Sequence, residues 1–478
     1  MSKQSAMRCA GDVSGLGQLG ELTALVPAEL VDGVLDATRR GERRVRLLSA
    51  RAVVYFVLAM ALFPQDGYQG VWSHVVAGVG GGPGRFPSAS ALRQARDRLG
   101  VGPLAELFAR VRGPIAEGGT RGAWWRGLRV MAWDGTELEV PDSRANAELY
   151  GYPGSRRGRA GYPQVRLLAL VECGTRAMAD CVWGPLSGGE ATLAARLARA
   201  LEPGMLLLAD RNFDGFALWG RAAATGAHLL WRANTKRRLL PVLRELPDGS
   251  YLSVLADPAH GHRWDAWRRR GTLPEGHHVR VVQYEVTTTT SNGTRSEPYT
   301  LITTLLDPQR HPAAELAALY RERWQIETAF HGLKTTLRGS RTVLRSQSPA
   351  RIDQELHAYL IVYQLLQRCR HRTALTARID PDRVSFKVAM RTARQTVIRA
   401  ATLPAPTTAT AIHHALTREL LPPHRRTRVS PRAVKRPVSP FAQRQLPKLR
   451  THGRTTLQAT YTITITTPQT PLTNSPSP

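Results

Sequence analysis

The hydrophobic pattern between residues 128 and 233 restricts the fold more than any other feature of this sequence. The segment 128–140, LRVMAWDGTELEV, alternates apolar and polar residues, which predicts two short strands joined as a β-hairpin at Asp134 and Gly135. Further strands are predicted at 164–173, 177–183, 204–210 and 228–233, with helices at 190–201 and 213–226. Three strands followed by alternating helices and strands predict an α/β fold with a mixed sheet flanked by helices.

This order of elements is typical of an RNase H-like catalytic core, and an ordinary α/β fold fits it as well. A helical domain is predicted before the core, because helical spacing recurs at 27–40, 49–63, 88–100 and 101–112. Ser88 or Ser90 is expected to cap the third of these helices, and Arg93, Arg96 and Arg98 are expected to be available to phosphates. The pattern fits a helix-turn-helix and an ordinary helical bundle equally.

Residues 235–310 interrupt the alternation with turn residues and with strands at 279–290 and 299–306, which predicts a β-rich insertion. A long amphipathic helix is predicted at 313–337 and a core helix at 355–369. From about residue 400 the composition shifts to Pro, Thr and Arg, which predicts a basic, partly disordered tail, although 460–467 has the pattern of an edge strand. The expected domains are therefore 1–120, 121–234, 235–310, 311–400 and 401–478.

The charge balance points to a polyanionic partner. Lys and Arg total 66 against 37 Asp and Glu, a formal net charge of +29, and solubility alone rarely requires such an excess. Nucleic acid is favoured over an anionic membrane, because the sequence has no extended basic amphipathic helix with a strongly apolar face. The basic tail is expected to lie along a phosphate backbone.

Cysteine usage and hydropathy indicate a cytoplasmic protein. Four cysteines, Cys9, Cys173, Cys181 and Cys369, are scattered without CxxC pairing, so neither a zinc finger nor a disulfide framework is predicted. The longest apolar run, 52–63, is shorter than the roughly 20 residues that cross a bilayer, and no signal-peptide pattern is present. We expect a location with intracellular DNA in the bacterial cytoplasm, at the nucleoid.

Two aspartates stand at the ends of predicted strands, where ligands commonly gather in α/β folds. Asp134 follows the strand VMAW, and Asp210 ends the strand MLLLA. Carboxylates that converge on one spot are what two-metal phosphodiester chemistry requires, because hard cations take oxygen ligands. Each aspartate alone is also a common turn residue, so neither by itself predicts a site.

The predicted helix 313–337 adds the third carboxylate. Tyr320, Arg323, Glu327 and Lys334 are spaced by three, four and seven residues, which places them in one polar stripe beside an apolar stripe. The helix can therefore bury its apolar stripe and present Glu327 at the border between core and solvent. A solvated helix face with an intrahelical pair between Arg323 and Glu327 would give the same spacing, but lysine is scarce in this chain and Lys334 falls in register.

Taken together these motifs resemble the DDE transposases of the insertion element four family. The resemblance is carried by DGT at Asp134, by the PDSRAN that follows it, by LADRNF at Asp210 and by Tyr-x2-Arg-x3-Glu-x6-Lys ending at Lys334. It extends over most of the chain, including the helical start and the basic RVSPRAVKRPVSPFAQR near the end. Asn212 departs from the family's usual glycine, and the long gap between Asp210 and Glu327 is as expected for members with a β-strand insertion.

The resemblance implies a cut-and-paste mechanism on double-stranded DNA. Water attacks the phosphodiester at the transposon's terminal inverted repeat, the freed 3′ hydroxyl forms a hairpin with the opposite strand, and the reopened end joins target DNA. Asp134, Asp210 and Glu327 would be the catalytic residues and hold two ions, Mg²⁺ or Mn²⁺ in preference to zinc. Arg323, Lys334 and Tyr320 would contact phosphate. Two ends must be held together, which implies a homodimer on DNA.

Further residues enter as weaker candidates. Arg232, Lys236, Arg237 and Arg238 follow the strand at 228–233 on the side expected for Asp210 and are expected to contact DNA phosphate. Hairpin chemistry also needs an aromatic residue to stack on a displaced base, for which Trp264 and Trp267 are candidates, although such tryptophans are more often core. The histidines near these residues lack the spacing of metal ligands and are interpreted as surface residues.

Two other functions remain open from the sequence. A non-catalytic DNA-binding derivative of a transposase would keep the basic regions, but the three intact carboxylates argue against it. A nuclease with an RNase H-like fold would hydrolyse nucleic acid without joining it. No cofactor other than the metal ions and no membrane partner is predicted.

Overall fold

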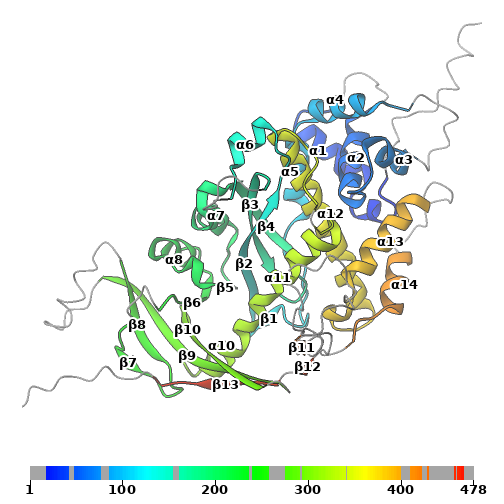
Figure 1. Ribbon diagram of the computed structural model, residues 1–478. Coiled ribbons are helices and arrows are strands. Elements are labelled where there is room, and N and C mark those ends of the chain that lie inside the picture. The colour runs from blue at the N-terminus through cyan, green and yellow to red at the C-terminus, as the bar shows by residue number, and fades with distance from the viewer. Residues whose placement is uncertain are drawn as a thin grey trace, which may run out of the picture. The chain divides into compact units, whose positions relative to one another are not determined.

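The computed structural model describes residues 18–41, 48–76, 86–153, 161–235, 240–257, 275–290, 293–340, 342–399, 410–422, 428–429, 457–458 and 460–467 (Figure 1). The chain divides into two compact units. The first unit comprises residues 1–208, 225–227 and 322–420, and the second comprises 209–224, 228–321 and 421–478. Across the described residues, no helix has the length and apolar character needed to span a membrane.

The first unit begins with helices that surround one apolar helix. After the 3₁₀ turn η2 (Leu22–Leu25), the helices of this region are α1 (Ala28–Ala37), α2 (Ala50–Leu62), α3 (Tyr68–Val76), α4 (Ala89–Leu99) and α5 (Gly102–Val111), and α2 is the apolar one. Residues 52–62 of α2 are all buried, because α1, α3, α4 and the later helix α12 (Pro349–Thr376) pack around it. Ser88 caps α4 by accepting a hydrogen bond from the Ala91 amide at 3.1 Å, which confirms one of the two predicted caps.

The sheet of the first unit has the order β4-β3-β2-β5, with β1 beside β2. Its strands are β1 (Trp124–Trp125), β2 (Leu128–Glu139), β3 (Gln164–Glu172), β4 (Met178–Pro185) and β5 (Met205–Ala209). β2, β3 and β4 are antiparallel neighbours, whereas β2 and β5 are parallel. The short elements between them are α6 (Arg144–Tyr150), η3 (Leu186–Gly188), α7 (Gly189–Leu197) and η4 (Ala198–Ala200). The predicted mixed α/β architecture is confirmed.

The hairpin predicted at Asp134 and Gly135 is wrong. β2 continues through both residues as one strand, in which Asp134 pairs with Ala169 and Gly135 with Leu168 of β3. Asp-Gly favours a turn only where the chain is free to reverse, and here the pairing with β3 continues on both sides of it. Asp134 therefore lies within a central strand and does not follow one.

The helix predicted at 313–337 is present but is not uniform. It consists of α10 (Ala313–Leu319), the 3₁₀ segment η7 (Tyr320–Arg323), α11 (Trp324–His331) and the π-helical segment η8 (Gly332–Leu337). The π segment begins at Gly332, where an added Cβ would lie 3.3 Å from Tyr363. Apolar periodicity cannot predict these changes of winding, which often accompany functional residues.

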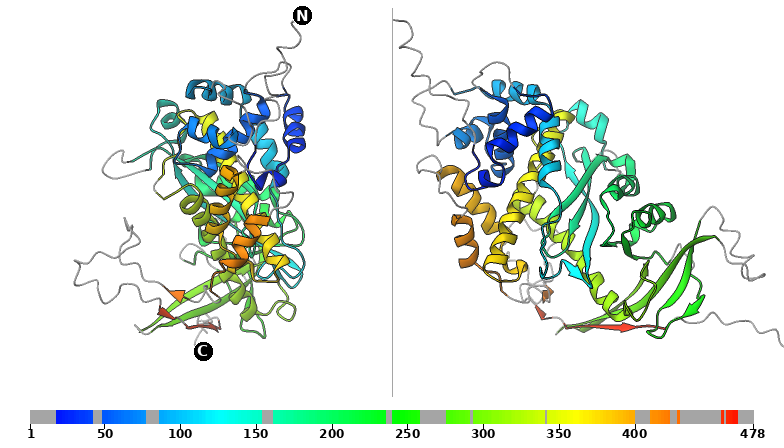
Figure 2. Two further views of the ribbon diagram at one scale, coloured as in Figure 1. Left: turned by 90° about the vertical axis from the view of Figure 1, so that its right-hand side faces the viewer. Right: turned by 180° about the vertical axis from the view of Figure 1, so that it is seen from behind.

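Three further helices complete the first unit. The core helix predicted at 355–369 is α12, which is longer than expected and packs against α2, α5, α13 (Phe386–Arg399) and α14 (Thr410–Arg418). A 3₁₀ turn, η9 (Pro381–Arg383), connects α12 to α13. In Figures 1 and 2, α12 lies beside the N-terminal helices along much of its length.

The second unit is built on an antiparallel sheet in the order β6-β10-β9-β8-β7. Its elements are η5 (Arg211–Phe213), α8 (Phe216–Ala223), β6 (His228–Arg232), β7 (Arg244–Glu245), β8 (Tyr251–Ala256), β9 (Gly276–Thr290), β10 (Gly293–Thr303), α10, β13 (Thr460–Ile465) and the pair β11 (Arg428–Val429) and β12 (Leu457–Gln458). The strands predicted at 279–290 and 299–306 correspond to β9 and β10.

The predicted edge strand near the end of the chain is confirmed. β8 pairs with residues 276–281 of β9, and β13 pairs with residues 284–289 of the same strand. Figure 2 shows β13 in red against the green strands of this unit. The C-terminal strand thus covers the part of β9 that β8 leaves unpaired, which blunts an exposed strand edge.

Arg96 is not available to phosphates as the sequence predicted. Its side chain is fully buried in the first unit and donates hydrogen bonds to Gln354 Oε1 at 3.0 Å, Ser346 Oγ at 3.2 Å and the Arg351 carbonyl at 3.1 Å. A buried guanidinium has to find acceptors, and here they come from α12, from the segment before it and from the Tyr68 hydroxyl of α3. Arg96 therefore joins α4 to α12, whereas Arg93 and Arg98 of the same helix are exposed.

We predict that Arg96→Met destabilises the protein by about 3 kcal/mol, because it strands several buried acceptors at once. Thermal unfolding of the variant measures the loss. Arg93→Met on the exposed face of α4 is the matched control and should leave the melting temperature unchanged. Equal melting temperatures for the Arg96 variant and the parent protein would contradict the structural role.

Candidate active site

Asp134 occupies the middle of β2, on the face that it shares with Thr136 and Leu138 because side chains alternate along a strand. Its Oδ1 accepts a hydrogen bond from the Gly135 amide at 2.9 Å. β3 pairs with the strand from Met131 to Glu139, through Asp134, whereas β5 pairs with it only as far as Ala132. The carboxylate is therefore held on a rigid support.

Arg323 brings two of the predicted carboxylates together. Its Nη1 lies 3.8 Å from Asp134 Oδ2, and its Nη2 donates to Glu327 Oε1 at 3.2 Å. Asp134 comes from β2, whereas Arg323 and Glu327 come from η7 and α11, so the guanidinium connects the strand to the helical segment. The intrahelical pair expected for a solvated helix face is present, but the same arginine also reaches the aspartate on the sheet.

Lys334 contacts the same strand at Thr136, two residues after Asp134. Its Nζ donates a hydrogen bond to Thr136 Oγ1 at 2.9 Å. Burial lowers the pKa of Lys334, and the positive charge of Arg338 lowers it further, while Glu137 and Glu139 oppose the shift. The lysine predicted from the motif therefore lies over β2, two residues from Asp134.

Asp210 and Tyr320 are connected through the backbone of the second unit. Asp210 directly follows β5, as predicted, and is the residue before η5. The buried Tyr320 hydroxyl donates to the carbonyl of Ala209, the residue before Asp210, at 3.0 Å. Tyr320 thus fixes the chain at Asp210, and its predicted contact with phosphate stays a prediction. Asn212 keeps a negative φ, so the departure from glycine causes no backbone strain among the described residues.

The three predicted ligands do not form a metal cluster in this structure. Within the described ranges, no three His, Cys, Asp or Glu side chains converge closely enough to hold an ion. Asp134 and Glu327 are instead the two carboxylates that share the Arg323 guanidinium. The oxygens of these two carboxylates already face the positive charge of Arg323, and oxygen atoms are the ligands that hard divalent ions prefer.

The other predicted DNA contacts are only partly described. The Arg232 guanidinium lies 4.0 Å from the centre of the Tyr299 ring, and its Nη2 donates to the Pro298 carbonyl at 3.5 Å, both on β10. Lys236, Arg237 and Arg238 lie outside the described residues, and so do Trp264 and Trp267. Their predicted roles are untested.

The sequence interpretation missed Trp324. This tryptophan directly follows Arg323 at the start of α11, and 63% of its surface is exposed. A single exposed ring does not by itself indicate a binding surface, but this one stands between two residues of the proposed site. Its position between Arg323 and Glu327, inside the four-residue motif, was the signal that could have identified it.

Glu190 of α7 was also missed. It lies against the opposite face of β2, where a Cβ added to Gly135 would stand 2.5 Å from its Oε1 and 3.0 Å from its Cδ. The glycine of the DGT motif is therefore required by this close approach and not by a turn. Nothing in the local sequence around Glu190 predicts the contact.

Comparison with known proteins agrees with the motifs. The family described as "Insertion element 4 transposase N-terminal" matches residues 16–109. The family described as "Transposase DDE domain" matches residues 125–365, which is half of the chain. The transposase InsG for insertion sequence element IS4 of Escherichia coli K12 is 25% identical over 343 residues, covering 71% of this chain and 74% of that protein. The putative transposase InsZ of the same organism is 30% identical over 125 residues, covering 26% and 42%.

Among solved structures, the piggyBac transposase synaptic complex with hairpin DNA matches with a TM-score of 0.43 at 10% identity, covering 84% of this chain and 85% of that one. The two matched sequence families define an enzyme class, the DDE transposases. Within it, this chain belongs to the insertion element 4 family and is a transposase.

We predict that Gly135→Ala lowers the free energy of unfolding by about 1 kcal/mol, because the new methyl group must displace the Glu190 carboxylate. The double variant Gly135→Ala with Glu190→Ala should recover most of this loss in chemical denaturation. Gly118→Ala is the control, since an added Cβ there meets nothing within 4 Å. Failure of the Glu190 change to rescue Gly135→Ala would contradict the contact.

Proposed function

We propose that the chain is a cut-and-paste transposase that cleaves transposon ends and joins them to target DNA with two divalent ions. The observation that carries the proposal is the convergence of Asp134 and Glu327, far apart in sequence, on the guanidinium of Arg323. Acidic residues are outnumbered by basic residues in this chain, and carboxylates that converge on one group are what metal-assisted phosphodiester cleavage requires.

We further propose an RNase H-like catalytic core. The antiparallel meander β2-β3-β4, followed by β5 parallel to β2, supports it. In this arrangement Ala132 of β2 pairs with Leu208 of β5. Asp134 follows Ala132 by two residues in the sequence, and Asp210 follows Leu208 by two residues. The expected domains at 1–120, 121–234, 235–310, 311–400 and 401–478 belong to the same proposal.

Asp134, Asp210 and Glu327 are the proposed ligands of Mg²⁺ or Mn²⁺. Their oxygens suit these hard ions better than zinc. When bound, the ions would activate the attacking oxygen and stabilise the charge that develops on the phosphate. The remaining steps depend on side chains that hold the DNA and keep the carboxylates in place.

Arg323, Lys334 and Tyr320 have different roles in this proposal. A guanidinium has five N–H donors, so Arg323 can hold a phosphate while it still orients Asp134 and Glu327. Lys334 lies over β2 and would provide a point charge for the phosphate that is cleaved at the carboxylates. Tyr320 positions the backbone at Asp210 through the Ala209 carbonyl and is also a candidate phosphate contact.

The proposed partners are the terminal inverted repeats and the target, both double-stranded DNA. The net charge of +29 supports this, and Arg232, Lys236 and Arg237 are proposed phosphate contacts outside the carboxylate site. A homodimer on DNA would hold the two ends, and a cytoplasmic, nucleoid-associated location would follow from the substrate.

A hairpin intermediate requires a base to leave the duplex stack, and Trp324 is the proposed ring that receives it. The indole is exposed and directly follows Arg323, so a base displaced beside the held phosphate would meet it. Stacking on an aromatic ring is sequence-tolerant and recovers part of the energy lost on unstacking.

The direct experiment incubates purified protein with Mg²⁺, labelled candidate ends and a target plasmid. Joined products support transposition. Cleavage without joining favours a nuclease, and retardation without cleavage favours a non-catalytic DNA-binding derivative. Flanking genomic sequence, with inverted repeats bordered by short direct repeats, identifies the ends to use.

We predict that Glu327→Gln reduces cleavage of the ends by about 10³-fold, because a metal ligand that stabilises the transition state by several kcal/mol is lost. End binding in a mobility-shift assay should be retained. Mg²⁺ should raise the melting temperature of the parent protein and have a smaller effect on the variant.

The matched control for this variant is Glu148→Gln, an exposed carboxylate on α6 that pairs with Arg144. It should cleave at the parent rate. If Glu327→Gln cleaves as fast as this control, Glu327 is not a ligand and the site assignment is wrong.

A separate prediction concerns Trp324. Trp324→Ala should leave the first strand cleavage intact and reduce hairpin formation by about 10- to 100-fold, the range expected for loss of one stacked base. Gel analysis of both products gives the ratio. Phe86→Ala removes a ring of similar exposure, 62%, elsewhere in the first unit and should have no effect. Unchanged hairpin yield in Trp324→Ala would assign the base to another residue.

A further inference from the structure

The turn between β3 and β4 contains a strained arginine. Arg176 has a φ of +62°, in the left-handed region that glycine adopts readily and other residues adopt rarely. Within the described ranges three other non-glycine residues have a positive φ, namely Arg39, Arg126 and Arg378, and all three are exposed. The side chain of Arg176 is only 13% exposed. Backbone strain under a buried charged group indicates that this side chain has a task that glycine could not perform.

The backbone of the turn is held without help from the Arg176 side chain. Glu172, at the end of β3, is fully buried and accepts hydrogen bonds from the Ile115 amide at 3.0 Å, the Ala116 amide at 2.9 Å and the Thr175 hydroxyl at 2.6 Å. The Arg176 amide donates to the Glu172 carbonyl at 3.0 Å. A glycine at position 176 would keep this backbone hydrogen bond, so the turn does not require the arginine in order to form.

The Arg176 guanidinium connects the turn to the helix that carries Glu327. Its Nε donates to Gln325 Oε1 at 2.7 Å, and its Nη2 pairs with the Asp382 carboxylate of η9. Gln325 belongs to α11, is buried, and donates from its own Nε2 to Glu322 Oε2 at 3.2 Å. The Cys173 thiol of the same turn donates to the Glu322 carbonyl at 3.5 Å. The turn thus holds the start of α11 at two neighbouring points.

Gln325 lies between Arg323 and Glu327 in the sequence and points to the other side of the helix. Two residues along an α-helix are about 200° apart, whereas residues four apart share a face. On that shared face, the Arg323 guanidinium lies beside both Glu327 and Asp134. A contact that holds Gln325 from behind therefore sets the rotation of α11, and with it the directions of Arg323 and Glu327.

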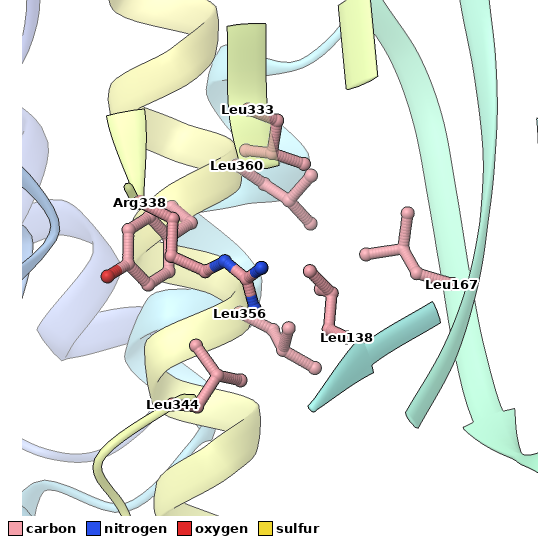
Figure 3. A pocket seen from close by; sticks show the side chains of 8 residues that line it. Leu138, Leu167, Leu333, Arg338, Leu344, Leu356 and Leu360 are labelled. Atoms are coloured by element: carbon pink, nitrogen blue, oxygen red, sulfur yellow. The ribbon is translucent and has the colours of Figure 1, made fainter. Parts of the chain in front are cut away.

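Apolar packing alone would define this rotation less sharply. Further along the segment, η8 packs on leucines of β2, β3 and α12 around a small cavity, which Figure 3 shows from close by. The leucines that line it are Leu138, Leu167, Leu333, Leu344, Leu356 and Leu360, and the Arg338 side chain reaches in among them. Apolar contacts are non-directional, whereas a hydrogen bond weakens steeply away from its preferred angle. The hydrogen bond at Gln325 is therefore suited to orient α11.

We propose that Arg176 is a positioning residue for the proposed catalytic centre. It holds Gln325, and through Gln325 it keeps Arg323 and Glu327 directed towards Asp134. The inference rests on the proposed function, in which Asp134, Asp210 and Glu327 hold the metal ions. Glycine is the residue that suits the backbone at 176, but it has no side chain to reach α11.

The first test is Arg176→Gly, which removes the side chain and relieves the backbone strain. The melting temperature should stay within about 3 °C of the parent value, because this relief offsets the lost hydrogen bonds. The turnover number for cleavage of the ends should fall about 10- to 100-fold, as expected when reacting groups are misplaced by about 1 Å. Affinity for the ends in a mobility-shift assay should be retained. Cleavage at the parent turnover number would overturn the proposal.

A second variant keeps the test valid if Arg176→Gly does not fold. Gln325→Met keeps a side chain of similar length but offers Arg176 no oxygen acceptor, and it should lower the turnover number by a similar factor. In the double variant the turnover number should fall no further than in either single variant, because both changes break the same contact. Losses that multiply would show independent effects and overturn the proposal.

Mn²⁺ binding gives a readout that does not depend on turnover. Electron paramagnetic resonance of the full chain without DNA should show an affinity for Mn²⁺ that is about 10-fold weaker in Arg176→Gly than in the parent, as expected when a metal ligand loses its orientation. Arg378→Gly is the matched control, because it relieves the same kind of strain at an exposed arginine. It should change neither Mn²⁺ affinity nor turnover.

The outcomes separate this inference from the proposed function. A parent protein that binds Mn²⁺ and cleaves, with equal Mn²⁺ affinity in Arg176→Gly, would overturn the role of Arg176 alone. A parent protein that neither binds Mn²⁺ nor cleaves the ends would overturn the proposed function, and the inference with it.

Discussion

The pairing of β2 with β3 is the constraint on which the rest of the site depends. β3 pairs with the strand from Met131 to Glu139, through Asp134, and β5 supports its first part as far as Ala132, so its side chains alternate regularly between two faces. On one face, successive positions meet successive parts of the helical segment: Asp134 meets Arg323, Thr136 meets Lys334, and Leu138 lines the cavity of Arg338. On the other face, Gly135 leaves room for Glu190. A shift of the strand by one residue would exchange these faces and separate every one of these contacts.

The helical segment that carries the motif changes its winding along its length. A regular α-helix from 313 to 337 would advance evenly, but a 3₁₀ segment holds Tyr320 and Arg323 and a π segment holds Lys334. These changes alter the rotation and rise along the segment, so the motif's side chains are not directed by an ideal 3.6-residue period. Arg323 closes the arrangement electrostatically, because its single charge is shared between one carboxylate from the strand and one from the helix. Removing either carboxylate would leave the guanidinium with one acidic partner of the pair.

Sequence patterns predicted much of this arrangement and failed at identifiable points. Period-two and helical spacing located most strands and helices, and the fixed spacing of the four-residue motif identified Arg323 and Lys334, which contact side chains of β2. The hairpin at Asp134 was wrong because Asp-Gly reports a local turn preference, whereas pairing with β3 depends on residues far along the chain. Arg96 was grouped with Arg93 and Arg98 as available to phosphates, because most of the acceptors that bury it lie more than two hundred residues away. Glu190 was missed because close approach to a glycine has no signature in a single sequence, whereas Trp324 could have been identified from its place inside the four-residue motif.

The buried arginines change how the charge of this protein should be interpreted. A formal charge of +29 indicates a polyanionic partner, but Arg96, Arg280 and Arg338 are withdrawn from the surface and cannot contribute to a DNA-binding face. Arg280 resembles Arg96 in having its own acceptors, including Ser250 Oγ at 2.8 Å and the His311 carbonyl at 2.6 Å. Arg338 differs from both, because two of its donors have none. Identical side chains in one chain thus join structural elements where the fold provides oxygen atoms, and keep donors without acceptors where most of the surrounding side chains are leucine, so the local supply of acceptors decides how each buried arginine is satisfied.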